Sequence, residues 1–132
     1  MKQFNLPILL AIATASLLLY GCILGPERGS CEGSLTLENP IPDTTVAVGD
    51  TLLIDLTNPP VFVSSKGRVS YSYSILTGIQ NVDLSVIADP NDAEGRLLII
   101  VGETTGEAMV EILASSGCLE NSQKLDINII DR

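Results

Sequence analysis

Residues 68–75 read Arg-Val-Ser-Tyr-Ser-Tyr-Ser-Ile, and from Val69 to Ile75 apolar or aromatic side chains alternate strictly with serines. A period of two is typical of a β-strand with one buried and one exposed face, because successive side chains point to opposite faces of a sheet. We therefore predict a mid-sheet strand with Tyr71 and Tyr73 together on its core face. The alternative is that the two tyrosines form a platform for a sugar.

Short runs of strand-forming residues recur on both sides of this stretch, separated by Gly, Pro, Asn and Asp. The run from Arg96 to Val101 is apolar after its first residue, which is typical of a strand covered on both faces. About seven strands in about 100 residues predict an all-β domain, an immunoglobulin-like sandwich, with a barrel as the alternative. The predicted strands cover residues 34–38 and 44–48, as one split strand, then 51–56, 68–75, 82–86, 96–101, 108–112 and 125–129.

The N-terminus has the parts of a secretory signal, with Lys2 as a basic start and an apolar stretch over residues 6–20. As an export helix this stretch would reach about 22 Å, which is too short for a hydrocarbon core of about 30 Å. The sequence Leu19-Tyr20-Gly21-Cys22 then resembles the lipobox of bacterial lipoproteins. We expect residues 1–21 to be a signal peptide and Cys22 to be acylated. The alternative is an ordinary secretory signal followed by a chance cysteine.

Cleavage before Cys22 changes the net charge from −9 to −10, because Lys2 is the only charged residue that is removed. We expect no nucleic acid partner, since binding to phosphates requires clustered Lys and Arg. Anionic lipid also repels an acidic chain, so membrane contact is expected through the acyl chains on Cys22. In a host with two membranes we expect the outer one, because Ile23 stands where an aspartate often marks retention in the inner membrane.

Two cysteines, Cys31 and Cys118, remain after acylation. An oxidising compartment favours a disulfide between them, and that bond would contribute about 4.6 kcal/mol in the chain-entropy model. Two free thiols, or one reactive and one buried thiol, are the alternatives. We interpret residues 22–32, which contain Gly, Pro and charges without a period, as a flexible tether before a domain over residues 33–132.

Residues 40–50 contain a proline-rich bend, a short strand and then Gly-Asp. This stretch resembles the opening of the bacterial cadherin-like and immunoglobulin-like domains of cell-envelope proteins. Residues 97–101, residues 106–112 and a final strand ending at Ile130 are similar to later strands of the same family. The resemblance implies a β-sandwich but is poorly specific for function.

The resemblance has two further implications. Immunoglobulin-like sandwiches place the N-terminus at the same end as the loop between the last two strands, so Cys31 and Cys118 would be neighbours. Calcium-binding relatives carry an Asp-rich loop between the second and third strands, whereas residues 64–68 contain Lys66 and Arg68. We therefore expect no calcium site in this loop, and no cofactor.

The residue types give little support for catalysis. The chain contains no histidine and no tryptophan, so the usual general base and the commonest metal ligand are absent. Ser65 and Lys66 could form a nucleophile and base, but adjacent turn residues point in different directions. Residues 89–95 form an acidic turn, which we interpret as a solvated hairpin turn, with a cation site as the alternative.

These observations predict a non-enzymatic lipoprotein of the cell envelope that acts as an interaction or structural module. One alternative is a small inhibitor or accessory subunit of an envelope enzyme or secretion complex. Another is a hydrolase. The sequence does not identify the protein partner.

Overall fold

The computed structural model describes residues 30–132, whose regular secondary structure is entirely β-strand. The expected signal peptide (residues 1–21), the lipidation site Cys22 and most of the expected tether (residues 22–32) lie outside the described residues. Residues 31–132 form one compact unit. No helix in the described part of the chain is long and apolar enough to cross a membrane. The strands are β1 (Leu35–Leu37), β2 (Thr44–Ala47), β3 (Thr51–Asp55), β4 (Phe62–Ser64), β5 (Ser70–Thr77), β6 (Val82–Ala88), β7 (Arg96–Gly102), β8 (Gly106–Ser116) and β9 (Leu119–Ile130).

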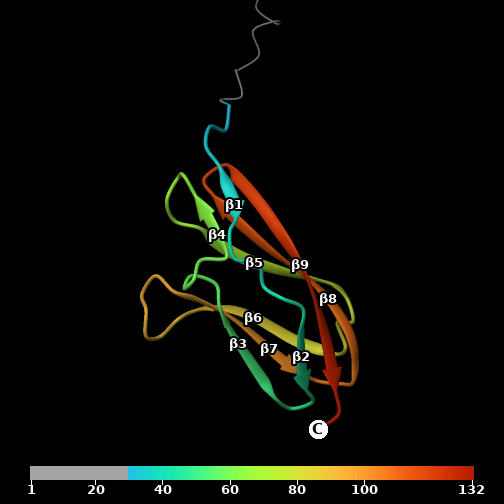
Figure 1. Cartoon of the computed structure of the whole chain (residues 1–132). Helices are drawn as coiled ribbons and strands as arrows, with labels where there is room; N and C mark the ends of the chain where they lie inside the picture. The colour runs from blue at the N-terminus through green and yellow to red at the C-terminus, as the bar shows by residue number, and fades with distance from the viewer. Residues whose placement is uncertain (1–29) are drawn as a thin grey trace, which may run out of the picture. The chain divides into compact units, whose positions relative to one another are not determined.

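Two sheets form the layers of a sandwich (Figure 1). One has the strand order β2-β9-β8-β5, and the other has the order β3-β7-β6. Strand β2 runs parallel to β9, and the remaining pairs in both sheets are antiparallel. A short ribbon of β1 and β4 forms a separate pair beside them. The predicted all-β, immunoglobulin-like sandwich is confirmed.

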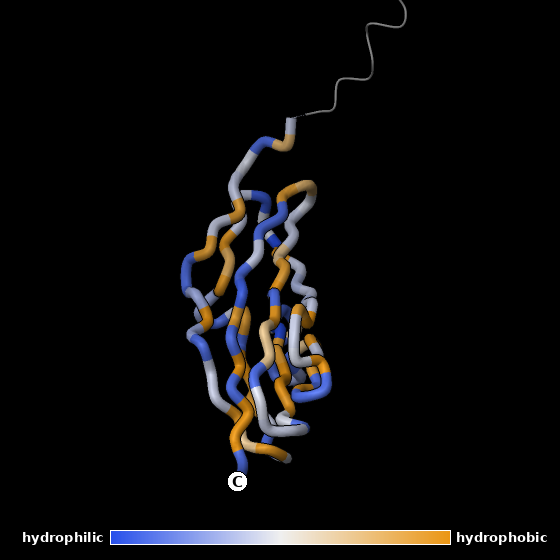
Figure 2. The backbone as a smooth tube through the Cα atoms, turned by 90° about the vertical axis from the view of Figure 1, so that its right-hand side faces the viewer, coloured by the Kyte–Doolittle hydropathy of each residue, from blue (hydrophilic) through white to orange (hydrophobic). Residues whose placement is uncertain are grey.

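The core lies between the two sheets and consists mainly of alternate strand residues, together with a few loop residues. In β9, buried Leu125, Ile127 and Ile129 alternate with exposed residues. Blue and orange segments accordingly alternate toward the C-terminus in Figure 2. The buried cluster consists of Leu35, Ile41, Val46, Leu56, Val61, Phe62, Val82, Leu84, Leu98, Ile100, Ala108, Val110, Ile112, Ala114, Leu125, Ile127 and Ile129.

The strand that contains the serine and tyrosine repeat is present but lies at a sheet edge, so the mid-sheet position predicted for it is wrong. Tyr71 packs against the core, and its ring centroid lies 6.3 Å from that of Phe62. Tyr73 is 38% exposed, so its predicted core position is wrong as well. An edge strand has no neighbour on one side, and a large ring there remains accessible to solvent.

The strands differ from the sequence prediction in two further ways. Strand β4 was not expected, and it pairs with β1 through the register Thr36 to Val63. Strands β8 and β9 are longer than predicted and form a continuous hairpin from Gly106 to Ile130. Their two-residue turn begins with Gly117, whose φ of 63° is the left-handed conformation that tight hairpin turns require.

Candidate interaction face

Strand β7 is buried on one face only, although its sequence predicted a strand covered on both. Leu98 and Ile100 point into the core and are fully buried. The alternate residues Leu97, Ile99 and Val101 point the other way and are only half-buried. They belong neither to the buried cluster nor to the partly buried residues that pack against it. Among the described residues, no second layer therefore packs on the outer face of β7.

The neighbouring strands extend this apolar stripe to both edges of the sheet. Ile99 pairs in register with Leu53 of β3 on one side and Ser85 of β6 on the other. Leu97 in the same way stands between Asp55 and Ile87. Leu53 is 57% exposed and Ile87 is 43% exposed, although both are large apolar residues. We call this surface the apolar face, and its residues are Thr51, Leu53, Asp55, Asp83, Ser85, Ile87, Leu97, Ile99 and Val101.

The apolar face carries two carboxylates, and they lie at opposite corners. Asp83 shares a row with Val101 and Thr51, at one end of the three strands. Asp55 shares a row with Leu97 at the other end, on the opposite edge strand. Most of the face between them is uncharged, which is the composition found at the centre of protein interfaces.

Asp55 is already committed to bonds within its own chain. Its carboxylate accepts hydrogen bonds from the backbone N–H of Thr57 at 2.8 Å and from the Thr57 hydroxyl at 2.9 Å. The N–H of Asn58 donates a third bond, at 3.1 Å. The bond from the Thr57 N–H is the main cause that lowers the pKa of Asp55 below its usual value, because it stabilises the ionised carboxylate.

The opposite outer face, on the β2-β9-β8-β5 sheet, is polar by comparison. Its β5 residues are serines, and its β8 residues include Glu107 and Glu111. Strand β9 adds Glu120, Lys124 and Asp126 to the same side. Leu113 is an exposed apolar residue there, at 37%. The two sheets therefore differ sharply in what they present to solvent.

The sequence signal that could have identified the apolar face is the apolar doublet, a pair of consecutive apolar residues within a strand. A half-buried strand alternates apolar and polar residues, whereas Leu52-Leu53 and Val86-Ile87 place apolar residues on both sides of their strands. The third case is the run from Leu97 to Val101. All three irregularities lie on the same sheet, and their outward members meet on one surface.

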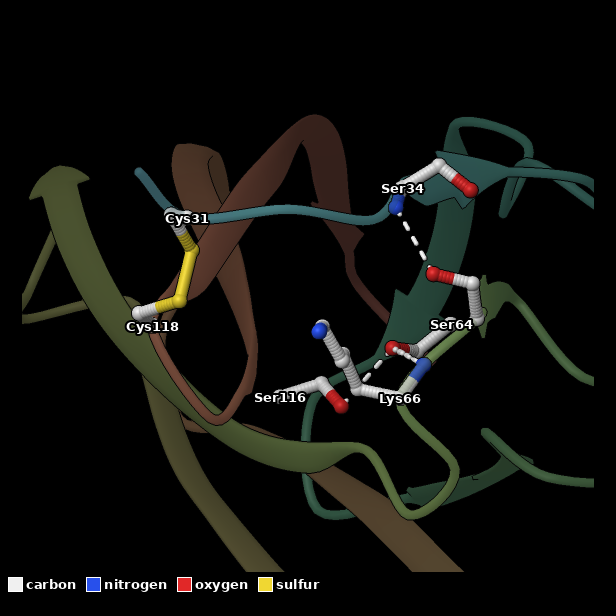
Figure 3. The surroundings of a disulfide bond; sticks show 7 residues. Cys31, Ser34, Ser64, Lys66, Ser116 and Cys118 are labelled. Atoms are coloured by element: carbon white, nitrogen blue, oxygen red, sulfur yellow. Dashed lines mark hydrogen bonds between the residues drawn. A yellow bond between two sulfur atoms is a disulfide. The ribbon is translucent and has the colours of Figure 1, made fainter. Parts of the chain in front are cut away.

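A second structured region surrounds the residues that precede β1. The disulfide between Cys31 and Cys118 is present, with the two Cα atoms 5.9 Å apart (Figure 3). It joins the residues before β1 to the turn between β8 and β9, as the family resemblance implied. Nearby, the N–H of Ser34 donates to Ser65 Oγ at 2.8 Å, and the Ser64 hydroxyl bonds to that of Ser116 at 2.8 Å.

The geometry supports neither Ser65 and Lys66 as a nucleophile and base nor a hydrolase site. Ser65 Oγ accepts the Ser34 N–H as part of the entry region. A shallow hollow of about 350 Å³ lies over the polar face and contains the carboxylates of Asp43, Glu107 and Asp126. Asp43 accepts the backbone N–H of Asp126 at 3.0 Å. The chain contains no histidine, the most common general base.

The acidic turn of residues 89–95 is closed by its own hydrogen bonds. Asp89 accepts the N–H of Asn91 at 2.8 Å, and Asp92 accepts the N–H of Glu94 at 3.0 Å. Glu94 also lies 3.6 Å from the guanidinium of Arg68. Within residues 30–132, no group of three or more His, Cys, Asp or Glu side chains is arranged to hold a metal ion.

Solved structures with this fold come from proteins of different kinds. The chain is similar to domains 4 and 5 of the S-layer protein SbsC, with a TM-score of 0.52 and 13% identity over 75% of this chain and 54% of that one. It is similar to the complex of titin M10 with an obscurin-like 1 Ig domain, with a TM-score of 0.51 and 10% identity over 76% and 98% of the two chains.

A third similar structure is an endo-fucoidan hydrolase of glycoside hydrolase family 107, with a TM-score of 0.53 and 16% identity over 79% of this chain and 14% of that one. This chain therefore spans about half of the S-layer fragment and about one seventh of the hydrolase. No protein-family model matches the sequence, and no curated protein matches it. At these identities the likeness shows the fold alone, an immunoglobulin-like domain.

Proposed function

We propose that this chain is a lipid-anchored, non-enzymatic protein of the cell envelope whose immunoglobulin-like domain acts by binding protein. The apolar face is the observation that carries the proposal. A contiguous apolar patch of a few hundred Å² on the surface of a soluble domain is often a contact site. Here five apolar residues adjoin one another on a single sheet: Leu53, Ile87, Leu97, Ile99 and Val101.

The sequence supports the anchoring part of the proposal through the apolar stretch of residues 6–20 and the motif that ends at Cys22. The disulfide gives further support, because such bonds persist in oxidising compartments outside the cytoplasm. It also fixes the chain only nine residues after Cys22, at Cys31. A domain tethered in this way would stay close to the membrane surface, and in a diderm host we propose the outer membrane.

The same face also suits a small inhibitor or accessory subunit, which would use it to bind one enzyme or one secretion complex. This second function differs from the first in the number of partners and not in the surface. A hydrolase receives no support from the site geometry described above.

Labelling and cross-linking together test the proposal. Radioactive palmitate should enter the wild-type protein and not Cys22→Ser, and the label should fractionate with the outer membrane of a diderm host. A photo-reactive amino acid at Leu53 should cross-link to protein in intact envelopes, while the same group at Leu113, on the polar face, should cross-link less. Equal labelling of both proteins, or equal cross-linking at both positions, would contradict the proposal.

A further inference from the structure

We infer that the apolar face binds a second copy of this chain, face to face, in a symmetric dimer. The inference rests on the proposed function, since it names a partner for the face proposed above. It depends on the arrangement of the two carboxylates on that face, because an acidic protein can pair with itself only where its like charges do not meet.

The strand register places the face on a grid of three strands by three rows. Thr51, Val101 and Asp83 make the first row, and Asp55, Leu97 and Ile87 make the third. The middle row is Leu53, Ile99 and Ser85, so Ile99 occupies the centre.

A symmetric dimer presents the same face on both copies, and its two-fold axis lies in the plane between them. In aligned packing the strands of two sheets lie within about 30° of each other, and the axis then runs along the strands or across them. With the axis along the strands, Asp55 faces Ile87 of the second copy and Asp83 faces Thr51. With the axis across the strands, Asp55 faces Thr51 and Asp83 faces Ile87.

In both arrangements each carboxylate therefore lies opposite a neutral side chain, and Ile99 meets its own copy at the centre. Had the two aspartates shared a row or a strand, one of these axes would bring carboxylates together. Asp55 is further suited to a low-dielectric boundary because three hydrogen bonds already solvate its charge. The charge pattern of the face is thus compatible with self-pairing in either aligned orientation.

The contact is small, so the association is weak and reversible. With strands about 4.8 Å apart and a rise of about 3.4 Å per residue, the grid covers about 300 Å² on each copy. A stable complex buries about 800 Å² on each partner. Attachment of both copies to one membrane would raise their effective concentration and favour the dimer without new contacts.

Analytical ultracentrifugation of residues 22–132, exported so that the disulfide forms and with Cys22→Ser to prevent acylation, tests the inference without lipid. We expect a monomer–dimer equilibrium with a dissociation constant below about 1 mM. Leu53→Asp should weaken it by about tenfold or more, because each copy would bury an unpaired charge. The matched variant Leu113→Asp places the same charge on the polar face, at an exposed position, and should change it less than about twofold.

Salt gives an independent readout. Two copies of net charge −10 repel each other at long range, so added salt should strengthen a dimer whose contact is apolar. A protein that stays monomeric to about 1 mM, a dimer unaffected by Leu53→Asp, or a dimer weakened by salt would each overturn the inference. A partner other than a second copy would appear as the monomeric outcome together with Leu53 cross-links to a different protein. The palmitate result does not enter this experiment, so failure of anchoring and failure of self-pairing are distinguishable.

Discussion

The hydroxyl of Tyr71 donates a hydrogen bond to the backbone carbonyl of Leu56 at 2.9 Å, and it lies 3.4 Å from the N–H of Phe62. Tyr71, on β5, therefore bonds both to the residue after β3 and to the first residue of β4, which lie 15 and 9 positions before it in the chain. Burial raises the pKa of Tyr71 because it disfavours the ionised phenolate.

Replacing Tyr71 should show how much its hydrogen bond to Leu56 contributes to stability. Tyr71→Phe keeps the ring and removes the hydroxyl, and we expect a loss of about 1 kcal/mol in the free energy of unfolding by urea denaturation. The Leu56 carbonyl keeps a second donor, the N–H of Val61 at 3.0 Å, which limits the cost. Tyr73→Phe, at a 38% exposed position on the same strand, should change stability by less than about 0.5 kcal/mol. Equal losses in both variants would contradict this role.

The disulfide should carry a large share of the domain's stability. We expect the double variant Cys31→Ser, Cys118→Ser to melt about 10–15 °C below the oxidised protein, taking half of the chain-entropy estimate as effective. Thermal unfolding followed by circular dichroism measures this, and the β-strand signal below the transition should remain. An unchanged melting temperature would contradict the prediction.

Gly33 should be intolerant of a side chain. It has a φ of 123°, and an added Cβ would lie 2.6 Å from Ser65 Oγ, which accepts the Ser34 N–H. We expect Gly33→Ala to reduce the free energy of unfolding by about 1–2 kcal/mol more than Gly67→Ala. The control shares the positive φ, at 97°, but its Cβ would meet nothing within 4 Å. Similar losses would show that the contact with Ser65 is unimportant.

Asp55 should make the domain sensitive to acid. Its folded pKa is lowered, so its contribution to stability is complete above the unfolded pKa, near 3.8, and is lost as the pH falls through the lower folded value. Asp55→Asn should therefore show a shallower fall in urea midpoint between about pH 4 and pH 2 than the wild type. Asp83→Asn removes one carboxylate from the same face and is the control. The same flattening in both variants would contradict the assignment to Asp55.

Calcium should not bind tightly. Asp89 and Asp92 accept N–H groups of their own turn, and Lys66 and Arg68 occupy the loop where calcium-binding domains of the family that the sequence resembles carry acids. Titration calorimetry should detect no micromolar affinity, and EDTA should leave the melting temperature unchanged. A calcium-dependent rise in melting temperature would identify residues 89–95 as a site.

The period of two predicted the strands and their inward faces well, because burial on one side imposes alternation locally. It could not show which strands lie at an edge, so Tyr73 was placed in the core. Edge position depends on which strands pair, and β5 pairs with β8 about 40 residues later. Strand β4 escaped prediction because its three residues are held by the distant β1, and so short a run carries no period of its own.

The apolar face could not be predicted from any single strand. The run from Leu97 to Val101 shows that both faces of β7 are apolar, but whether another layer covers the outer face depends on the rest of the fold. The apolar doublets in β3 and β6 were visible, yet their meaning required the register that aligns Leu53 with Ile99. The disulfide was easier to predict, because Cys31 and Cys118 are the two cysteines that remain if Cys22 is acylated, and two cysteines allow one pairing.

The Cys31–Cys118 bond also determines how mechanical load would travel through the domain. A pull on the chain ahead of Cys31 reaches the covalent bridge before it reaches β1, and the bridge passes the force to the turn at Cys118. Residues 31–118 form a closed loop that the pull cannot lengthen, so the β1–β4 ribbon is not peeled open. The force is instead delivered to β9, which is paired along its length with β8 and holds β2 on its other side. A pull applied ahead of Cys31 would thus have to separate β9 from both β8 and β2.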